Sequence, residues 1–274
     1  MNLCSSSYPC LKSSRQQTAE QQQRTPLYAC IHQLVMVEIF SGSGHLGKAF
    51  LALGYQVLLR DICLGPQYDL TKRKNVCCLM RIIGQAAVVH MGPPCSSFSI
   101  ARRGSAPRSR QYPMGRPDLP PADVERVRIG NLCLLVAVRV VVACCLRGIP
   151  VTLENPTSSR MFICPCLVRV VKRFHAVMVH TVFCAYGTPW RKQTTFAVWN
   201  CPALSRLETK CNSKQGICEH SHKPHQILEG SNGHGSNWTK VAEPYPPRLC
   251  RKLARLVRSH HMRRASDVLR NISL

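Results

Sequence analysis

The stretch V-V-H-M-G-P-P-C-S-S-F-S, residues 88–99, decides the fold. An apolar, β-branched run ends abruptly in Gly-Pro-Pro, and Cys95 follows at once. Because two consecutive prolines fix the backbone and cannot extend a strand ladder, the pattern predicts a buried strand over residues 86–91 that ends in a loop. In open α/β sheets, ligands bind at the carboxyl ends of the strands, so we expect Cys95 at a functional edge.

Strands and helices are expected to alternate on both sides of this stretch. The expected strands are residues 33–40, 56–60, 86–91, 150–153, 177–184 and 194–199, and the expected helices are residues 45–52, 74–83, 120–146, 159–173 and 245–257. This alternation implies an α/β fold with a doubly wound, mainly parallel, Rossmann-like sheet. The pattern breaks at residues 200–237, which are rich in Cys and His and form a small insertion.

The excess of basic residues indicates what kind of molecule the protein binds. The 274 residues include 37 Lys and Arg against 13 Asp and Glu, a net charge of +24. Such an excess favours a protein that neutralises phosphates, with a generally basic proteome as the plain alternative. The 17 cysteines are odd in number and no apolar leader precedes them, which favours an intracellular, reducing location, nuclear if the source is eukaryotic. The apolar residues 132–146 are too short to span a membrane and include Arg139, so no membrane partner is expected.

A glycine turn follows the first expected strand. The segment G-S-G-H-L-G begins at Gly42, and Asp61 lies 19 residues later, at the end of the next strand. Glycines here let the backbone approach a cofactor, and a carboxylate at the next strand end accepts hydrogen bonds from ribose hydroxyls. The pattern fits NAD and S-adenosylmethionine equally, and a plain tight turn is the third interpretation.

Two reactive residues follow other strands of the same sheet. Cys95 requires a cationic setting to act as a thiolate nucleophile, and five arginines follow it, at positions 102, 103, 108, 110 and 116. Glu154, after the apolar run V-T-L, is suited to hydrogen-bonding a ring nitrogen. The alternatives are a buried structural cysteine and an incidental glutamate in an Asn-Pro turn.

Five segments together resemble a known family. E-I-F-S-G-S-G, R-D-I, Y-D-L-T, G-P-P-C-S-S-F-S and L-E-N-P occur in the order and spacing of the cytosine carbon-5 methyltransferases. Y-G-T-P-W-R-K-Q-T-T-F and A-E-P-Y-P-P-R-L resemble two later motifs of that family, so the similarity covers residues 35–253.

The resemblance implies a reaction and assigns residues to it. Cys95 would attack carbon-6 of cytosine, Glu154 would engage ring nitrogen 3, and carbon-5 would take a methyl group from S-adenosylmethionine. Such enzymes extrude the target base from its stack. The residues expected to line the cofactor are Phe40, Gly42 and Gly44, with Asp61 at the ribose and Asp69 near the adenine amino group. DNA is a more fitting substrate than a structured RNA such as tRNA, because the Thr-Cys pair of the RNA enzymes with a second catalytic cysteine does not occur here.

Three positions in the first of these later motifs depart from the family pattern, and Glu243 stands where the second has Asn. Trp190 stands where the family has Gln, and Lys192 and Thr194 stand where it has the arginines that help to hold the pyrimidine and the glutamate. A catalytically degenerate protein that binds nucleic acid without turnover is therefore the second hypothesis. A third, an NAD-dependent oxidoreductase, explains the glycine turn but gives Cys95 and Glu154 no joint role.

The Cys/His-rich insertion contains a candidate zinc set, Cys201, Cys211, Cys218 and His225. Three thiolates and an imidazole are suitable zinc ligands, and a metal would order so small a segment. The set lacks a C-x-x-C pair, so free thiols and exposed histidines are the alternative. The expected organisation is a disordered tail (1–27), a catalytic domain (28–199), the insertion as a target-recognition segment (200–237), a returning helix (238–258) and a basic tail (259–274).

Overall fold

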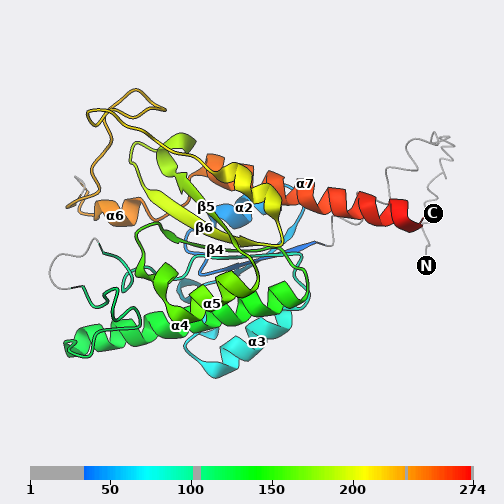
Figure 1. Ribbon diagram of the computed structural model, residues 1–274, viewed down its shortest axis with the longest axis horizontal. Helices are drawn as coiled ribbons and strands as arrows, with labels where there is room; N and C mark the ends of the chain where they lie inside the picture. The colour runs from blue at the N-terminus through cyan, green and yellow to red at the C-terminus, as the bar shows by residue number, and fades with distance from the viewer. Residues whose placement is uncertain (1–33, 101–105, 232–233, 273–274) are drawn as a thin grey trace, which may run out of the picture.

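A six-stranded sheet with the order β2-β1-β3-β4-β6-β5 forms the centre of the computed structural model (Figure 1). The structure describes residues 34–100, 106–231 and 234–272. The tail expected at residues 1–27 lies outside the described residues. The strands are β1 (Val35–Ile39), β2 (Gln56–Arg60), β3 (Val88–Met91), β4 (Val151–Pro156), β5 (Val177–Val182) and β6 (Gln193–Trp199).

The parallel part of the sheet contains a topological switch point. β1 pairs in parallel with β2 on one side and with β3 on the other, and β3 pairs in parallel with β4. The chain therefore moves outward in opposite directions from the β1–β3 pair. At such a point the connections leaving the two strands part, which opens a crevice at their carboxyl ends. Two of the segments singled out in the sequence, the glycine turn and the Gly-Pro-Pro-Cys loop, leave β1 and β3 at this edge.

The sheet is mixed: three of its five strand pairings are parallel, as expected of a mainly parallel sheet, and the two pairings of β6 are antiparallel. β6 lies between β4 and β5 and is antiparallel to both. The cause is the connection from β5 to β6, residues 183–192. A parallel return needs a crossover of about a dozen or more residues, whereas a shorter link closes an antiparallel pair. β4 is longer than the expected strand over residues 150–153, because its pairing with β6 continues to Pro156. Glu154 therefore lies inside the strand rather than after it.

Helices cover both faces of the sheet (Figure 1). α2 (His45–Leu51), the 3₁₀ helix η5 (Pro202–Leu207) and α7 (Pro247–Ile272) pack on one face, and α3 (Arg73–Ile83), α4 (Pro121–Leu146) and α5 (Pro165–Arg173) pack on the other. Side chains alternate between these faces along each strand, so Met36 belongs to the first core and Val37 to the second. The short elements are η1 (Ile62–Leu64), η2 (Pro66–Tyr68), η3 (Arg160–Ile163), η4 (Phe183–Tyr186) and α6 (Trp238–Val241).

Two expected helices have different bounds in the structure. The helix expected over residues 159–173 is divided into η3 and α5, because Cys164 precedes Pro165 and takes an extended backbone. The last helix continues to Ile272 rather than ending near residue 257. It is held there by His261, whose Nε2 lies 3.1 Å from the Ala87 carbonyl oxygen, and by Arg264, which donates to the Gly148 carbonyl over 3.1 Å.

α4 is the most apolar long helix of the described residues. By length and composition it could cross a membrane, and it is longer than the apolar stretch 132–146 that the sequence suggests. Core helices of α/β proteins have the same composition, and 44% of its most apolar window is buried. Leu134, Ala137 and Val141 of α4 are fully buried in the core of the second face. These contacts support the description of α4 as a core helix.

Candidate active site and metal cluster

Three residues in the turn between β1 and α2 have a left-handed backbone. Phe40, Gly42 and Gly44 all have positive φ, at 57°, 49° and 64°. Phe40 is unusual in this respect, since a bulky residue with positive φ is strained. A Cβ atom added to Gly42 would have no heavy atom within 4 Å, so the space above this glycine is open. Asp61 accepts a hydrogen bond from the Gly42 amide over 2.9 Å, which brings the predicted ribose partner to the turn.

A buried glutamate packs beneath this turn. The Gly47 amide donates to Glu38 Oε2 over 2.8 Å, and a Cβ atom at Gly47 would lie 2.8 Å from the Leu59 side chain. Gly47 therefore allows α2 to pack closely on the sheet. Burial raises the pKa of Glu38 to about 7, although the Gly47 hydrogen bond opposes this. For Asp61, the hydrogen bonds from Cys63 and Gly42 outweigh desolvation and lower its pKa.

Asp69, predicted to lie near an adenine amino group, is engaged in a local turn. Its Oδ1 accepts from both the amide and the hydroxyl of Thr71, over 2.9 and 2.6 Å. These hydrogen bonds lower the pKa of the Asp69 carboxyl. The same interactions would exist in a purely structural turn, so the assignment to a cofactor stays a prediction.

The loop that carries Cys95 is held in a defined conformation. The Cys95 carbonyl accepts from the amides of Phe98 and Ser99, each over 2.9 Å. Asn155, at the end of β4, donates from Nδ2 to the Pro93 carbonyl over 2.9 Å and so fixes the loop to the neighbouring strand. The cysteine is itself half-buried. Desolvation raises the pKa of its thiol, and the nearby Lys192 opposes this shift.

Arg108 has a structural role that the sequence does not indicate. The sequence predicts that Arg108, like the other arginines after Cys95, contributes to a cationic setting for that cysteine. In the structure its side chain is fully buried. Its guanidinium donates to the backbone and hydroxyl of Ser97, over 3.1 and 3.0 Å, and to Asn131 of α4 over 2.8 Å, and it lies 3.8 Å from the Phe98 ring centroid. Arg108 therefore pins the Cys95 loop to α4. Arg102 and Arg103 lie outside the described residues.

Glu154 is buried, and each of its carboxylate oxygens accepts a hydrogen bond. Thr194 of β6 donates to Oε1, and Tyr245 donates to Oε2 over 2.9 Å. A Cβ atom at Gly92 would lie 2.7 Å from the Tyr245 hydroxyl and 3.8 Å from Glu154 Oε2, so glycine is required where the Cys95 loop begins. Cys95 is close enough for the Glu154 charge to contribute to its raised pKa. The structure thus brings the two predicted catalytic residues to one edge.

The hydrogen bonds continue from Glu154 into the sheet. Tyr245 Oη lies 3.0 Å from His90 Nε2, and His90 Nδ1 lies 2.7 Å from Thr152 Oγ1. Burial lowers the pKa of His90 to about 3, so its ring is neutral and has one N–H. Because the Tyr245 proton points to Glu154, its oxygen accepts from His90 Nε2–H, and Thr152 then donates to Nδ1. Sequence reasoning missed His90 and Thr152, since neither follows a strand end.

Thr194 and Lys192, two of the positions that differ from the motif that the sequence resembles, lie at or beside this network. Thr194 holds Glu154 as described above, and Lys192 Nζ donates to the Ala242 carbonyl over 3.1 Å and lies 4.8 Å from the Phe183 ring centroid. Trp190 packs against the α7 side of the core. Two of the three substituted side chains thus contact the site or lie beside it.

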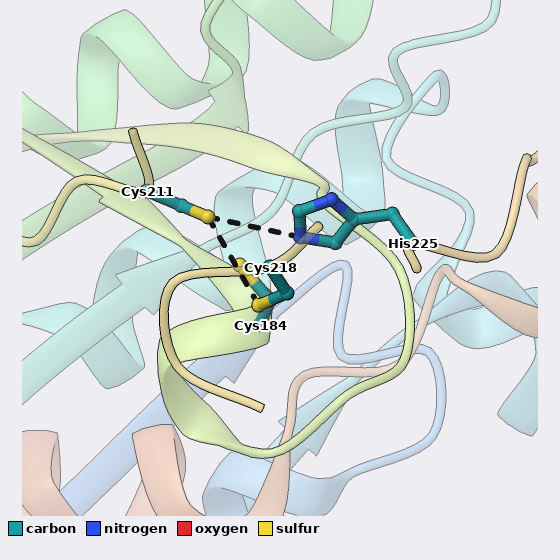
Figure 2. Close-up of side chains that lie close together, drawn as sticks. All are labelled: Cys184, Cys211, Cys218 and His225. Carbon is teal, nitrogen blue, oxygen red and sulfur yellow. Dashed lines mark hydrogen bonds between the residues drawn. The ribbon is translucent and has the colours of Figure 1, made fainter. Parts of the chain in front are cut away.

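A separate cluster of sulfur and nitrogen ligands lies where β5 ends (Figure 2). It consists of Cys184, Cys211, Cys218 and His225, whose ligand atoms all lie within 4.8 Å of one another. Cys211 Sγ lies 4.0 Å from Cys218 Sγ and 3.7 Å from His225 Nε2. The cluster could hold a metal ion. Three of its members are those predicted from the sequence.

The fourth predicted ligand, Cys201, is not part of the cluster. It is buried at the start of η5 and packs with the apolar residues of the α7 side of the sheet. Cys184 of η4 takes the expected place instead. The sequence conceals this exchange because Cys184 lies in η4, directly after β5 and 27 residues before Cys211, whereas Cys201 lies within the insertion.

A basic cavity of about 450 Å³ lies between η5 and α7. Five of its lining residues are cationic: Arg206, Arg248, Arg251, Lys252 and Arg255. Desolvation and the nearby Arg206 lower the pKa of Lys252, as expected where like charges crowd. An anionic group placed here would relieve the repulsion.

Comparisons of the chain with known protein families and with curated proteins find no match.

Proposed function

We propose that this protein is a methyltransferase that uses S-adenosylmethionine to methylate carbon-5 of cytosine in nucleic acid, with DNA favoured over tRNA. The observation that carries the proposal is the pairing of Cys95 with Glu154 at the carboxyl ends of β3 and β4, one strand from the glycine turn. An NAD-dependent oxidoreductase would have no use for this pair.

The chain's own residues have separable roles in the proposed reaction. Cys95 sulfur adds to carbon-6 of the cytosine ring, and the electrons of the 5,6 double bond move toward carbon-5 and ring nitrogen 3. Glu154, held in place by hydrogen bonds from two hydroxyl groups, passes to ring nitrogen 3 a proton equivalent to the one that the Cys95 thiol loses. After methylation, carbon-5 loses its proton to solvent water, and the 5,6 double bond re-forms as the bond from Cys95 to carbon-6 breaks. Ring nitrogen 3 then returns its proton through Glu154 to the leaving thiolate.

The β1–α2 turn is the proposed cofactor site. The open space above Gly42 and the positive φ angles of the turn fit a ligand that approaches the backbone closely, with Asp61 placed for ribose hydroxyls. S-adenosylmethionine, when bound, supplies the methyl group. The second proposed cofactor is zinc, at the cluster that includes Cys184.

Nucleic acid is the proposed partner, and the proposed location is intracellular, nuclear if the source is eukaryotic. The net charge of +24 and the basic cavity both favour polyanion binding. If Arg248 and Arg255 contact phosphates, replacing both with Gln would lower affinity for duplex DNA and reduce the slope of log K against log salt by about 2, or about 0.9 for each lost contact. An unchanged slope would remove the cavity from the proposed interface.

The decisive experiment traps the covalent intermediate. Duplex DNA containing 5-fluorocytosine cannot lose fluorine as a cation, so with S-adenosylmethionine present the proposed enzyme would stay bonded to it. We expect a denaturation-resistant complex with the unmodified chain, none with Cys95→Ser, and full trapping with Cys78→Ser, which alters an exposed cysteine of α3. The same assay with tRNA distinguishes the two substrates.

The catalytically degenerate alternative predicts a different result. It expects tight, salt-dependent binding of the same DNA, no trapped complex and no transfer of labelled methyl groups. This outcome with a protein that retains its folded stability would overturn the methyltransferase proposal and leave a binding function. The Thr194 hydrogen bond to Glu154 argues against this alternative, because the glutamate keeps a partner despite the departure at that position.

A further inference from the structure

We infer that Cys184, Cys211, Cys218 and His225 form a structural zinc site that fastens the segment 208–231 to the central sheet. The distances between these four side chains and their burial support the site, and neither depends on the methyltransferase proposal.

Two ligand-to-ligand distances match a tetrahedral zinc centre, and all four ligand atoms lie within 4.8 Å of one another. With Zn–S of about 2.3 Å and Zn–N of about 2.1 Å, a tetrahedron has S–S edges of about 3.8 Å and S–N edges of about 3.6 Å. The corresponding distances here are 4.0 Å between Cys211 and Cys218 and 3.7 Å between Cys211 and His225. Three thiols and an imidazole are soft and borderline ligands that suit zinc better than magnesium or calcium.

Burial in this segment is confined to the ligands. Between residues 208 and 231 only Cys211 and Cys218 are buried. They belong to a small cluster whose other buried members are Val182 and Cys184. So little apolar surface cannot offset the entropy of ordering more than twenty residues, whereas a zinc–thiolate centre supplies folding free energy directly.

The backbone around Cys218 supports a thiolate ligand. The His220 amide lies 3.4 Å from Cys218 Sγ and donates to it, and the Cys218 amide donates to the Lys223 carbonyl over 2.9 Å, closing a tight turn. The His225 amide donates to the Gly216 carbonyl over 3.2 Å, which brings the histidine back toward this turn. The loop is thus folded around its sulfur ligands.

The metal would tie two parts of the chain together. Cys184 lies in η4, directly after β5, whereas the other three ligands come from the insertion. The Gln226 amide also donates to the Pro189 carbonyl over 2.9 Å, beside the β5–β6 link. Phe183, the neighbour of Cys184, lies under Lys192, the cation near Cys95. Zinc would therefore fix the insertion close to the catalytic edge.

A competing set in the same loop provides an internal control. Cys211, Glu219 and His220 also lie close enough to share a cation. However, Glu219 and His220 are exposed, Glu219 accepts from the Asn212 amide over 2.8 Å, and His220 Nε2 lies 2.8 Å from the Lys210 carbonyl oxygen. The buried set is therefore the better site.

The test uses the full chain purified under reducing conditions, with zinc measured by elemental analysis and cobalt(II) as a spectroscopic replacement. We expect one zinc per chain and, with cobalt, the strong visible absorption of a tetrahedral thiolate complex. Cys184→Ser, Cys218→Ser and His225→Ala should each lose zinc, whereas the matched variants Cys201→Ser and His220→Ala should keep it.

Limited proteolysis of the unmodified protein tests the site without any substitution, in case a variant does not fold. Chelation of the unmodified protein should expose residues 212–230 to protease while the sheet stays intact, and added zinc should restore protection. A folded chain without zinc or cobalt binding, retention of zinc in Cys184→Ser with its loss in Cys201→Ser, or a Cys211–Cys218 disulfide in place of metal would each overturn the inference.

Discussion

Replacing Tyr245 with Phe tests the hydrogen-bond network around Glu154. The hydroxyl donates to a buried carboxylate and accepts from His90 Nε2–H, so its removal affects two partners. A hydrogen bond to a charged group contributes about 1.5–3 kcal/mol, and a buried polar group left without a partner costs about 1–3 kcal/mol. Because Tyr245 is only partly buried, we expect the free energy of unfolding to fall by about 2–4 kcal/mol.

The matched control is Tyr186→Phe. That hydroxyl donates over 3.0 Å to the neutral Leu207 carbonyl, so its loss should cost about 0.5–1.5 kcal/mol. Urea unfolding followed by circular dichroism measures both variants. A double-mutant cycle with Glu154→Gln should give a coupling energy of at least about 0.5 kcal/mol between positions 154 and 245. Equal losses in the two Tyr→Phe variants, or no coupling, would refute the assigned proton positions.

Two further predictions concern titration. Burial lowers the pKa of His90 to about 3 and that of His261 to about 4, while it raises that of Glu38 to about 7. Between about pH 4.5 and 6.5 the unfolded chain binds two more protons than the folded protein at the histidines and one fewer at the glutamate, a net difference of one proton. The free energy of unfolding should therefore fall by about 1.4 kcal/mol for each pH unit of acidification. A free energy of unfolding that does not change with pH in urea titrations would contradict this balance. Lys192→Gln removes a cation that lowers the pKa of Cys95. The pH at which iodoacetamide alkylates half of this cysteine, measured by mass spectrometry, should therefore rise. An unchanged alkylation profile would show that Lys192 does not act on the thiol.

The strand edge was predictable because it depends on local chemistry. A β-branched run that stops at Gly-Pro-Pro has few alternatives to a buried strand followed by a loop, and β3 ends at Met91 as that pattern indicates. The turn after β1 was predictable for a similar reason, since glycines at 42 and 44 permit the positive φ angles found there.

The remaining features depend on contacts between distant parts of the chain. Cys184 joins the metal cluster only because the insertion folds back onto the end of β5, and no spacing rule within the insertion indicates that return. Glu154 lies inside β4 because β6 pairs with the strand beyond the point expected from its own residues. Arg108 appears in the sequence as one basic residue among several, and only the packing of its loop against α4 buries it among neutral acceptors.

The departures at positions 192 and 194 gain a physical interpretation from the structure. An arginine can supply both a hydrogen-bond donor and a positive charge to a carboxylate and a ring. Here Thr194 supplies the donor to Glu154, and Lys192 supplies the charge near Cys95. Because the neutral Thr194 hydroxyl holds Glu154, the charge of Lys192 acts mainly on the Cys95 thiol. In the proposed reaction, Thr194→Val would therefore impair positioning of the ring at every pH, whereas Lys192→Gln would impair the reaction most at low pH, where the thiolate is scarce. If the two variants shared one pH profile, the two roles would not be separate.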